Sequence, residues 1–345
     1  MLAPLALAAQ PNGYYNSAAG LNGTALRQAL HDIIDNHNDI GYSALWSAYE
    51  QTDAKPNGKV WDMYSDKPGQ TPPYEFSFVT DQCGSYNSEN DCFNREHTFP
   101  DGYFNGASPM HSDLFMVFPS DGFVNGKRSN FPYGKVNNPT WTSLNGSKLG
   151  PNAFPGAPSG TAFEPIDSFK GDLARTYFYV ATRYFNEDGG WDDWEMANGA
   201  ELKSWAVQML LQWHHNDPVS AKEVNRNNAV YSFQNNRNPF IDNPMYADCI
   251  WGTADCSQTT SVSGPDAVQL YIVPNPASDY VELQSGQVGG AISVMVISTD
   301  GKAVYQGNLN DRAGLRIPVD NWAKGVYMIH FRSAGNAGVR KLVIQ

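Results

Sequence analysis

The stretch Asn94-Arg95-Glu96-His97-Thr98-Phe99-Pro100 carries the strongest structural and functional signal in the chain, because it places a carboxylate beside an imidazole. A carboxylate is a hard oxygen ligand of the kind that binds Mg²⁺, and a histidine with an ordinary pKa of about 6.5 can accept a proton at neutral pH. Neighbouring side chains on a strand face opposite ways. Glu96 and His97 can therefore converge only if the segment bends or ends there, and Pro100 favours an early end.

A second informative stretch covers residues 112–130. It reads Ser112-Asp113-Leu114-Phe115-Met116-Val117-Phe118-Pro119-Ser120-Asp121-Gly122-Phe123-Val124-Asn125-Gly126-Lys127-Arg128-Ser129-Asn130. A Glu-His pair alone is usually a surface carboxylate beside a hydrogen-bonded imidazole. The second stretch strengthens the functional interpretation, and its adjacent Lys127 and Arg128 are candidates for contact with phosphate.

Together the two stretches resemble the bacterial endonuclease I family, whose active site is a ββα-metal fold. The resemblance continues through residues 170–179, 213–219 and 235–242, and it spans roughly residues 14–250. It implies that Glu96 and Asn125 bind the metal and that His97 is the general base. The implied cation is Mg²⁺, with Mn²⁺ or Ca²⁺ as alternatives, and the implied partner is nucleic acid.

These roles imply a metal-dependent endonuclease that hydrolyses phosphodiester bonds of DNA with little sequence specificity, with RNA left open as a substrate. His97 would take a proton from water, and the attack of that water on phosphorus would leave a 5′-phosphate. The cation would stabilise charge on the leaving 3′ oxygen. The alternative is a catalytically impaired binding protein of the cell surface on the same fold. A peptidase is disfavoured, because the sequence has no His-Glu-x-x-His or Gly-x-Ser-x-Gly motif.

Two departures from the family pattern affect the expected site. Family members usually have histidines where this chain has Phe115-Met116, which supports the impaired alternative. Compact members also place a catalytic Arg in an insertion between the two stretches, and this chain lacks that insertion. Arg128 and Arg175 are the predicted catalytic replacements, with Arg237 as a third candidate. The residues predicted to bind substrate are Lys127, Arg128, Arg175 and Arg237.

Hydrophobic periodicity predicts an α+β fold, in which a domain of helices and short strands precedes a small β-sandwich. The family resemblance implies that the first domain is a ββα-metal nuclease domain with additional helices. Apolar residues recur at helical spacing over residues 26–34, 173–184 and 202–213. Ser220 and Glu223 form a capping-box pattern that predicts a further helix, which would place Arg226 and Arg237 on one face if it ran on. A polar helix face is predicted from the four-residue spacing of Arg175, Tyr179 and Arg183. This face would be either solvated or turned toward the phosphate backbone.

After the polar stretch 257–265, apolar residues recur at every second position, which predicts short strands. Several short strands within this length predict the β-sandwich. The segments 271–279, 298–302, 324–329 and 340–344 resemble sorting domains of the type IX secretion system. That resemblance implies export to the medium or the cell surface, whereas an adhesion or carbohydrate-binding module is the alternative. The predicted boundaries are a signal-peptide remnant at 1–10, a catalytic domain at 11–256, a linker at 257–266 and the sandwich at 267–345.

Four cysteines fall into two close pairs, Cys83 with Cys92 and Cys249 with Cys256. Local pairing suits two disulfide loops in an exported protein, and a zinc site would favour Cys-x-x-Cys spacing, which is absent. The apolar start of the chain indicates the end of a signal peptide or, alternatively, an Ala-rich tag remnant. No other apolar run reaches the roughly 18 residues that span a bilayer, and we expect a monomer.

The net charge of −12 is unevenly distributed along the chain. Residues 1–264 carry 16 basic and 29 acidic residues, and residues 265–345 carry 7 and 6. An acidic domain repels nucleic acid, whose binding depends largely on neutralised phosphates. The sequence therefore requires a local basic patch and a metal ion at the proposed site.

Overall fold

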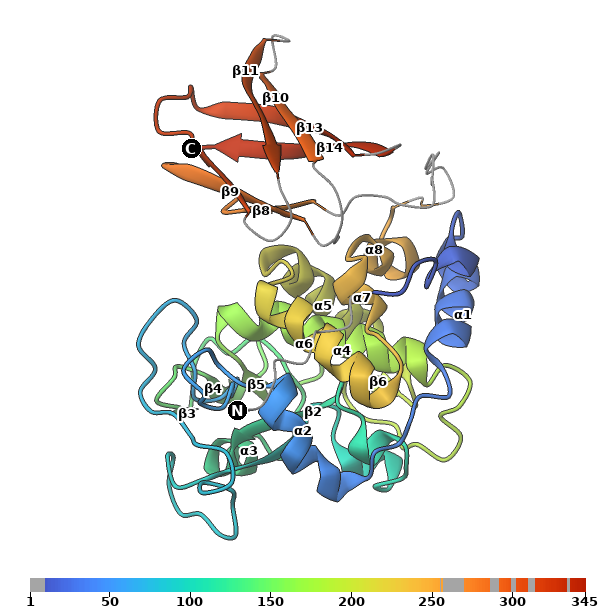
Figure 1. The fold of residues 1–345 in the computed structure, drawn as a ribbon. Coiled ribbons are helices and arrows are strands. Elements are labelled where there is room, and N and C mark those ends of the chain that lie inside the picture. The colour runs from blue at the N-terminus through green and yellow to red at the C-terminus, as the bar shows by residue number, and fades with distance from the viewer. Residues whose placement is uncertain are drawn as a thin grey trace. The chain divides into compact units, whose positions relative to one another are not determined.

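The computed structural model describes residues 10–254, 256, 270–285, 292–298, 302–309, 314–333 and 336–345. The chain forms a larger unit, Tyr15–Thr259, and a smaller unit that includes Thr260–Gln345. The larger unit combines helices with short sheets, whereas the smaller one is built of strands (Figure 1). The α+β class is thereby confirmed. Residues 1–9 of the predicted signal-peptide remnant and the whole predicted linker lie outside the described residues.

The four helices predicted from apolar spacing and from the capping box are present as α1 (Gly23–Ile34), α4 (Lys170–Arg183), α5 (Ser204–Asn216) and α6 (Ala221–Gln234). The larger unit also contains α2 (Leu45–Thr52), α3 (Gly122–Arg128), α7 (Pro239–Asp242) and α8 (Met245–Trp251). The capping box at α6 is present, because the Ser220 side chain accepts from the backbone N–H of Glu223 and the Glu223 side chain accepts in return. The helix ends at Gln234, so Arg237 does not continue its face.

Helix α4 lies inside the larger unit, where it contacts α1, α5 and α7 (Figure 1). Every residue from Gly171 to Arg183 is buried. The predicted polar, solvated face of this helix is therefore wrong: Arg175, Tyr179 and Arg183 are all enclosed by side chains from distant segments. The spacing of polar residues in the sequence could not show that α4 is buried. A helix that is buried on every side can carry polar residues when these have hydrogen-bonding or charged partners.

Between α2 and α4 the chain forms short strands and irregular loops in addition to α3. The strands are β1 (Phe93–His97), β2 (Val117–Asp121), β3 (Trp141–Thr142), β4 (Lys148–Pro151) and β5 (Thr161–Glu164), and the short strands β6 (Ala197–Asn198) and β7 (Glu201–Leu202) follow α4. β1 pairs antiparallel with β2, with His97 opposite Val117. α3 begins directly after β2, because the Asp121 side chain accepts from the backbone N–H of Val124 at 2.9 Å. β1, β2 and α3 form the predicted ββα unit.

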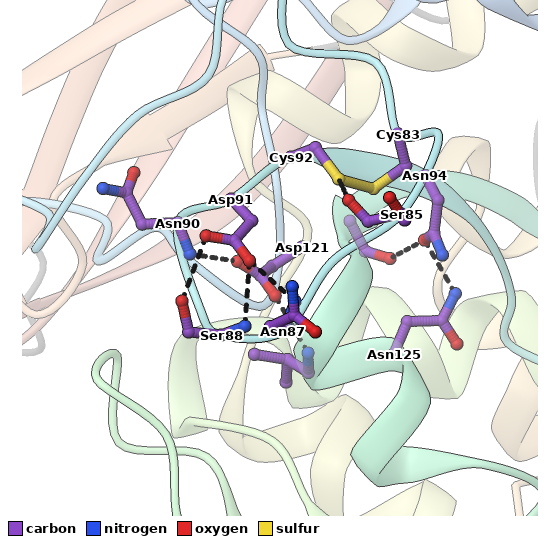
Figure 2. Close-up of a disulfide and its surroundings, with 12 residues drawn as sticks. Cys83, Ser85, Asn87, Ser88, Asn90, Asp91, Cys92, Asn94, Asp121 and Asn125 are labelled. Atoms are coloured by element: carbon purple, nitrogen blue, oxygen red, sulfur yellow. Dashed lines mark hydrogen bonds between the residues drawn. A yellow bond between two sulfur atoms is a disulfide. The ribbon is translucent and has the colours of Figure 1, made fainter.

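The two predicted disulfides are present, Cys83–Cys92 and Cys249–Cys256. The first closes a loop that leads straight into β1 (Figure 2). Within that loop the Asp91 carboxylate accepts from the backbone N–H groups of Asn87 and Ser88. The loop also packs on α3, because a Cβ added at Gly122 would meet the Cys83 sulfur at 2.6 Å.

Removal of the Cys83–Cys92 disulfide should lower the free energy of unfolding of the larger unit by about 2–3 kcal/mol, since the cross-link restricts the unfolded chain. The test is guanidinium unfolding of the C83S/C92S double variant against the parent, with C249S/C256S as the matched control for a second short loop. Unchanged midpoints for both double variants would show that neither bond stabilises the fold.

The smaller unit contains, within its described residues, seven strands in two sheets. They are β8 (Leu270–Val273), β9 (Tyr280–Ser285), β10 (Ile292–Ser298), β11 (Ala303–Leu309), β12 (Leu315–Pro318), β13 (Gly325–Ser333) and β14 (Asn336–Ile344). One sheet has the order β11-β10-β13-β14 and the other β12-β9-β8. The alternating apolar residues of both sheets form one core, which includes Val281, Val294 and Ile329. The dipeptide Asp300-Gly301, whose sequence predicts a hairpin turn, lies outside the described residues.

Among the described residues, no helix combines the length and the apolar character that a membrane span requires.

Candidate active site

A cavity of about 170 Å³ lies at the end of β1. Its lining includes Tyr42, Arg95, Glu96, His97, Asn125 and Arg128. Strand alternation places Asn94 and Glu96 on one face of β1, and Arg95 and His97 on the other. Because the strand ends at His97, Glu96 and His97 nevertheless reach the same cavity, as the sequence required.

The Glu96 carboxylate is 1% exposed and is held by three donors. The Tyr64 hydroxyl donates to Oε1 at 2.8 Å, the Arg128 guanidinium lies 3.0 Å from the same oxygen, and the Tyr133 hydroxyl lies at 3.5 Å. Burial raises the pKa of Glu96, and Arg128 opposes that rise. All three donors reach Oε1, so among the described residues Oε2 is the oxygen left to bind a ligand from the cavity.

Asn125 lies on α3 and faces Asn94 of β1 (Figure 2). Its Nδ2 donates to the Asn94 Oδ1 at 2.9 Å, and the same oxygen accepts from the Ser120 hydroxyl at 3.4 Å. Since the amide nitrogen is used in this way, the Asn125 carbonyl oxygen is the atom available to the cavity. One carboxylate oxygen of Glu96 and one amide oxygen of Asn125 form a hard donor set, which fits a divalent cation such as Mg²⁺.

His97 is 8% exposed, and its ring is fixed by its neighbours. Nε2 lies 3.2 Å from the backbone carbonyl oxygen of His111. A carbonyl can only accept, so Nε2 carries the proton of the neutral ring and Nδ1 keeps the lone pair. Burial lowers the pKa of His97 to about 4. The imidazole is therefore neutral at pH 7 and can accept a proton at Nδ1.

Arg128 is 1% exposed and binds backbone at the end of β1. It donates to the carbonyl oxygens of His97 and Thr98 at 2.8 and 2.5 Å, in addition to its pair with Glu96. These contacts make Arg128 a positioning residue, which fixes the carboxylate and the backbone beside the base. Its burial argues against the predicted role in direct contact with substrate.

Arg175 and Arg237 lie outside the cavity, and their predicted catalytic and substrate-binding roles are not supported. Arg175 is 0% exposed and donates to both carboxylate oxygens of Glu223, at 2.5 and 2.9 Å. Arg237 is 1% exposed and forms the same kind of pair with Asp242. A buried, paired guanidinium cannot reach phosphate without leaving its partner charge uncompensated.

Lys127 lies on α3 but does not line the cavity. Its ammonium lies 5.2 Å from the centre of the Phe123 ring, and the side chain is half-buried. Lys127 can therefore contact only a phosphate that lies beyond the cavity.

Arg95 is a charged residue of the cavity that the sequence-based assignment missed, as it did Tyr42 and Asp101. Its guanidinium carbon lies 3.5 Å from the centre of the Tyr42 ring and 4.5 Å from that of Trp46. One guanidinium nitrogen donates to the Tyr42 carbonyl oxygen at 2.9 Å, and the side chain is half-buried. The signal was available, because a position two residues before His97 shares its strand face.

Phe115 and Met116, which replace the family's usual histidines, are 2% and 0% exposed. Phe115 packs on Tyr179, with ring centres 4.8 Å apart. Neither residue lines the cavity. This departure therefore lies in the core, which weakens the case for an impaired site.

Comparison with known proteins agrees with this geometry. Residues 22–245 match the family described as Endonuclease I, and residues 271–345 match the family described as Secretion system C-terminal sorting domain. The chain is 36% identical to the extracellular ribonuclease of Bacillus amyloliquefaciens over 248 residues, which is 69% of this chain and 78% of that protein. It is 33% identical to the extracellular ribonuclease of Bacillus subtilis (strain 168) over 261 residues, 73% of this chain and 82% of the relative.

A weaker similarity extends to the extracellular deoxyribonuclease of Aeromonas hydrophila, at 26% identity over 139 residues, 39% of this chain and 50% of the relative. The Endonuclease I match contains β1, β2, α3 and every residue that lines the cavity. The chain is therefore a nuclease of a divalent-metal-dependent class, and its sorting domain marks it as a secreted or cell-surface protein. By this match, which covers well over half of its length, the chain belongs to the endonuclease I family.

Proposed function

We propose that this chain hydrolyses both DNA and RNA with little sequence preference and leaves 5′-phosphate ends. The observation that carries the proposal is the convergence of the Glu96, Asn125 and His97 side chains on one small cavity. A hard oxygen pair beside a neutral imidazole provides the two functions that phosphodiester hydrolysis needs, which are charge neutralisation and water activation.

Glu96 and Asn125 would hold the cation, for which Mg²⁺ is the best match to two oxygen donors in a largely hydrated site. When bound, such an ion supplies positive charge to the phosphate oxygens and to the leaving 3′ oxygen. Arg128, Tyr64 and Tyr133 keep Glu96 in place by their contacts with Oε1.

His97 acts as the base through Nδ1. It accepts a proton from a water whose oxygen forms the new bond to phosphorus, while the bond from phosphorus to the 3′ oxygen breaks and that oxygen takes a proton from solvent. Nε2 keeps its proton and continues to donate to the His111 carbonyl oxygen. This hydrogen bond keeps the ring oriented and stabilises the imidazolium as it forms.

This route uses an external water, so it needs no 2′-hydroxyl from the substrate. RNA and DNA can then react by the same steps, with the phosphate retained on the 5′ side. The names of the relatives agree with a broad substrate range, since two are called extracellular ribonucleases and one an extracellular deoxyribonuclease.

Arg95 is the residue that we assign to the scissile phosphate. The Tyr42 and Trp46 rings lie against its guanidinium, and one N–H group donates to the Tyr42 carbonyl oxygen. The other N–H groups of the planar guanidinium are the proposed donors to the phosphate oxygens. The Arg95→Ala variant should lower the cleavage rate by about 10²–10³, the range for loss of one preorganised donor. Steady-state cleavage of a labelled duplex, with Mg²⁺ affinity measured in parallel, checks this.

Two comparisons separate this role from a structural one. Added guanidinium ion at millimolar concentration should restore part of the Arg95→Ala rate, and Lys127→Ala should reduce the rate much less, because Lys127 does not line the cavity. A parental rate for Arg95→Ala, or an equal loss in both variants, would remove Arg95 from the mechanism.

The test of the proposed function is digestion of DNA and RNA strands of matched sequence, with Mg²⁺ and with excess chelator. Both strands should be cut, chelator should stop cleavage, and the 5′ ends should accept label from a kinase only after phosphatase treatment. Cleavage of RNA that leaves a 2′,3′-cyclic phosphate would contradict the water mechanism. Cleavage of RNA alone would restrict the substrate class.

Removal of residues 265–345 should leave the cleavage rate within about twofold of the parent and abolish delivery to the surface of the native host. Among the described residues, the core of the smaller unit consists of residues from that unit, and the residues that line the cavity lie between Tyr42 and Asn130. Activity of the purified truncated chain and its location in the host measure the two effects. A truncated chain that is folded but inactive would show that the nuclease needs its C-terminal domain.

A further inference from the structure

His97 belongs to a second group of potential ligands, which it forms with Asp101 and His111. His97, Asp101 and His111 each offer one ligand atom, and these atoms all lie within 4.8 Å of one another. Asp101 begins the 3₁₀ helix η3 (Asp101–Phe104), and His111 lies in η4 (Met110–Ser112). The two imidazole rings are nearly parallel, at 4°, with centres 5.1 Å apart.

The donor types of this group differ from those of Glu96 and Asn125. Two imidazole nitrogens and one carboxylate oxygen match the ligand sets of Zn²⁺ and similar transition-metal ions, whereas two oxygens match Mg²⁺. Ligands of a tetrahedral Zn²⁺ lie about 3.3 Å apart, given bonds of about 2.0–2.1 Å. The atoms here need to move closer by at most ~1.5 Å, which rotation of the half-buried His111 ring and of the Asp101 side chain can provide.

We propose that His97, Asp101 and His111 form an inhibitory site for Zn²⁺ or a similar transition-metal ion, distinct from the Glu96–Asn125 pair. Since Nε2 donates to the His111 carbonyl oxygen, Nδ1 is the His97 nitrogen that keeps a lone pair, and the ion is assigned to it. In the proposed function this same atom accepts the proton of the attacking water. Inhibition therefore rests on the proposed role of His97 as base, whereas binding of the ion does not.

A second cluster in the chain shows what distinguishes this site. His31, Asp35 and Glu187 also bring three ligand atoms within 4.8 Å. There the guanidinium of Arg183 lies 2.9 Å from Asp35 and 2.8 Å from Glu187, so each carboxylate is already paired with a fixed cation and half of their combined charge is offset. Within the described part of the chain, Asp101 has no ion pair with Lys or Arg, which leaves its charge available to a metal ion.

The experiment measures Zn²⁺ binding and Zn²⁺ inhibition separately on the full-length protein. Calorimetry follows Zn²⁺ binding in the presence of saturating Mg²⁺, and Co²⁺ absorption in the visible range reports ligation by imidazole. The cleavage assay determines the Zn²⁺ concentration that halves each variant's own Mg²⁺-supported rate. The variants are Asp101→Asn and His111→Ala, with Glu187→Gln as the matched control from the second cluster.

We expect one Zn²⁺ per chain and inhibition that tenfold more Mg²⁺ does not relieve. Asp101→Asn and His111→Ala should raise both the dissociation constant and the half-inhibitory concentration by at least about 10–100-fold, the range for loss of even an outer-shell partner of a metal site. Glu187→Gln should match the parent. His111→Ala keeps the backbone carbonyl that orients His97.

Three results would overturn the proposal. Relief of inhibition by added Mg²⁺ would place the Zn²⁺ ion at Glu96 and Asn125. An unchanged Zn²⁺ affinity in both Asp101→Asn and His111→Ala would place the ion elsewhere. Cleavage supported by Zn²⁺ alone would make the ion an activator. Specific Zn²⁺ binding that needs His111 and Asp101 in a protein without nuclease activity would retain the site and reject the proposed function instead.

Discussion

Replacement of His97 by alanine should lower the rate of phosphodiester cleavage by about 10²–10⁴, the range for loss of a general base, and leave Mg²⁺ and nucleic-acid binding near the parental values. The reason is geometric: Nδ1 of His97 is the proposed proton acceptor in the cavity, while the proposed metal ligands lie on other side chains. Single-turnover cleavage with saturating enzyme measures this rate without the influence of binding.

Two controls distinguish loss of the general base from misfolding of the variant. His215→Ala removes a half-exposed histidine that pairs with Asp248 on α8, and it should cleave at the parental rate. Added imidazole should restore part of the His97→Ala rate, because it can occupy the volume that the substitution leaves beside Tyr42 and His111. A His97→Ala rate equal to the parental rate would show that another group activates water.

Replacement of Glu96 by glutamine should weaken Mg²⁺ binding by at least about 10–100-fold, since it removes the only charged group of the proposed donor pair. Glutamine keeps an oxygen that can accept from Tyr64 and Arg128. Raised Mg²⁺ should therefore recover part of the cleavage rate. Calorimetric titration of Mg²⁺ measures the affinity, and an unchanged affinity would place the metal elsewhere.

The size of the residue introduced at Glu96 matters for this test. Glu96→Ala would leave the buried Arg128 guanidinium without its carboxylate, and breaking a buried pair costs about 3–5 kcal/mol of stability. Loss of activity in the alanine variant would thus mix unfolding with loss of the metal. Asn125→Ala carries no such penalty, and it should weaken Mg²⁺ binding less than Glu96→Gln because the amide is neutral.

The parts of the site that the sequence predicts are those set by local structure. Glu96 and His97 are adjacent, the strand ends with them, and Asn125 follows in the helix that directly continues β2. Their convergence needs only the ββα unit. The sandwich was predictable for a similar reason, because an apolar period of two specifies the strands before their pairing is known.

The parts that the sequence cannot predict depend on contacts between distant segments. Arg175 looks like a free cation until Glu223, 48 residues away, is found against it. Tyr64 and Tyr133 contact Glu96 from irregular segments on opposite sides of it in the chain, and neither belongs to a repeated pattern. Burial of charge is decided by such tertiary partners, which periodicity does not encode.

The most direct test of the account is the cleavage rate as a function of Mg²⁺ concentration for the parent, Glu96→Gln and His97→Ala in one experiment. We expect Glu96→Gln to shift the curve to higher Mg²⁺, and His97→Ala to lower the plateau by about 10²–10⁴ without moving the midpoint. These opposite signatures follow from one side chain that holds the cation and another that takes the proton. A shifted midpoint in His97→Ala with a parental plateau would make His97 a metal ligand and contradict its assignment as the base.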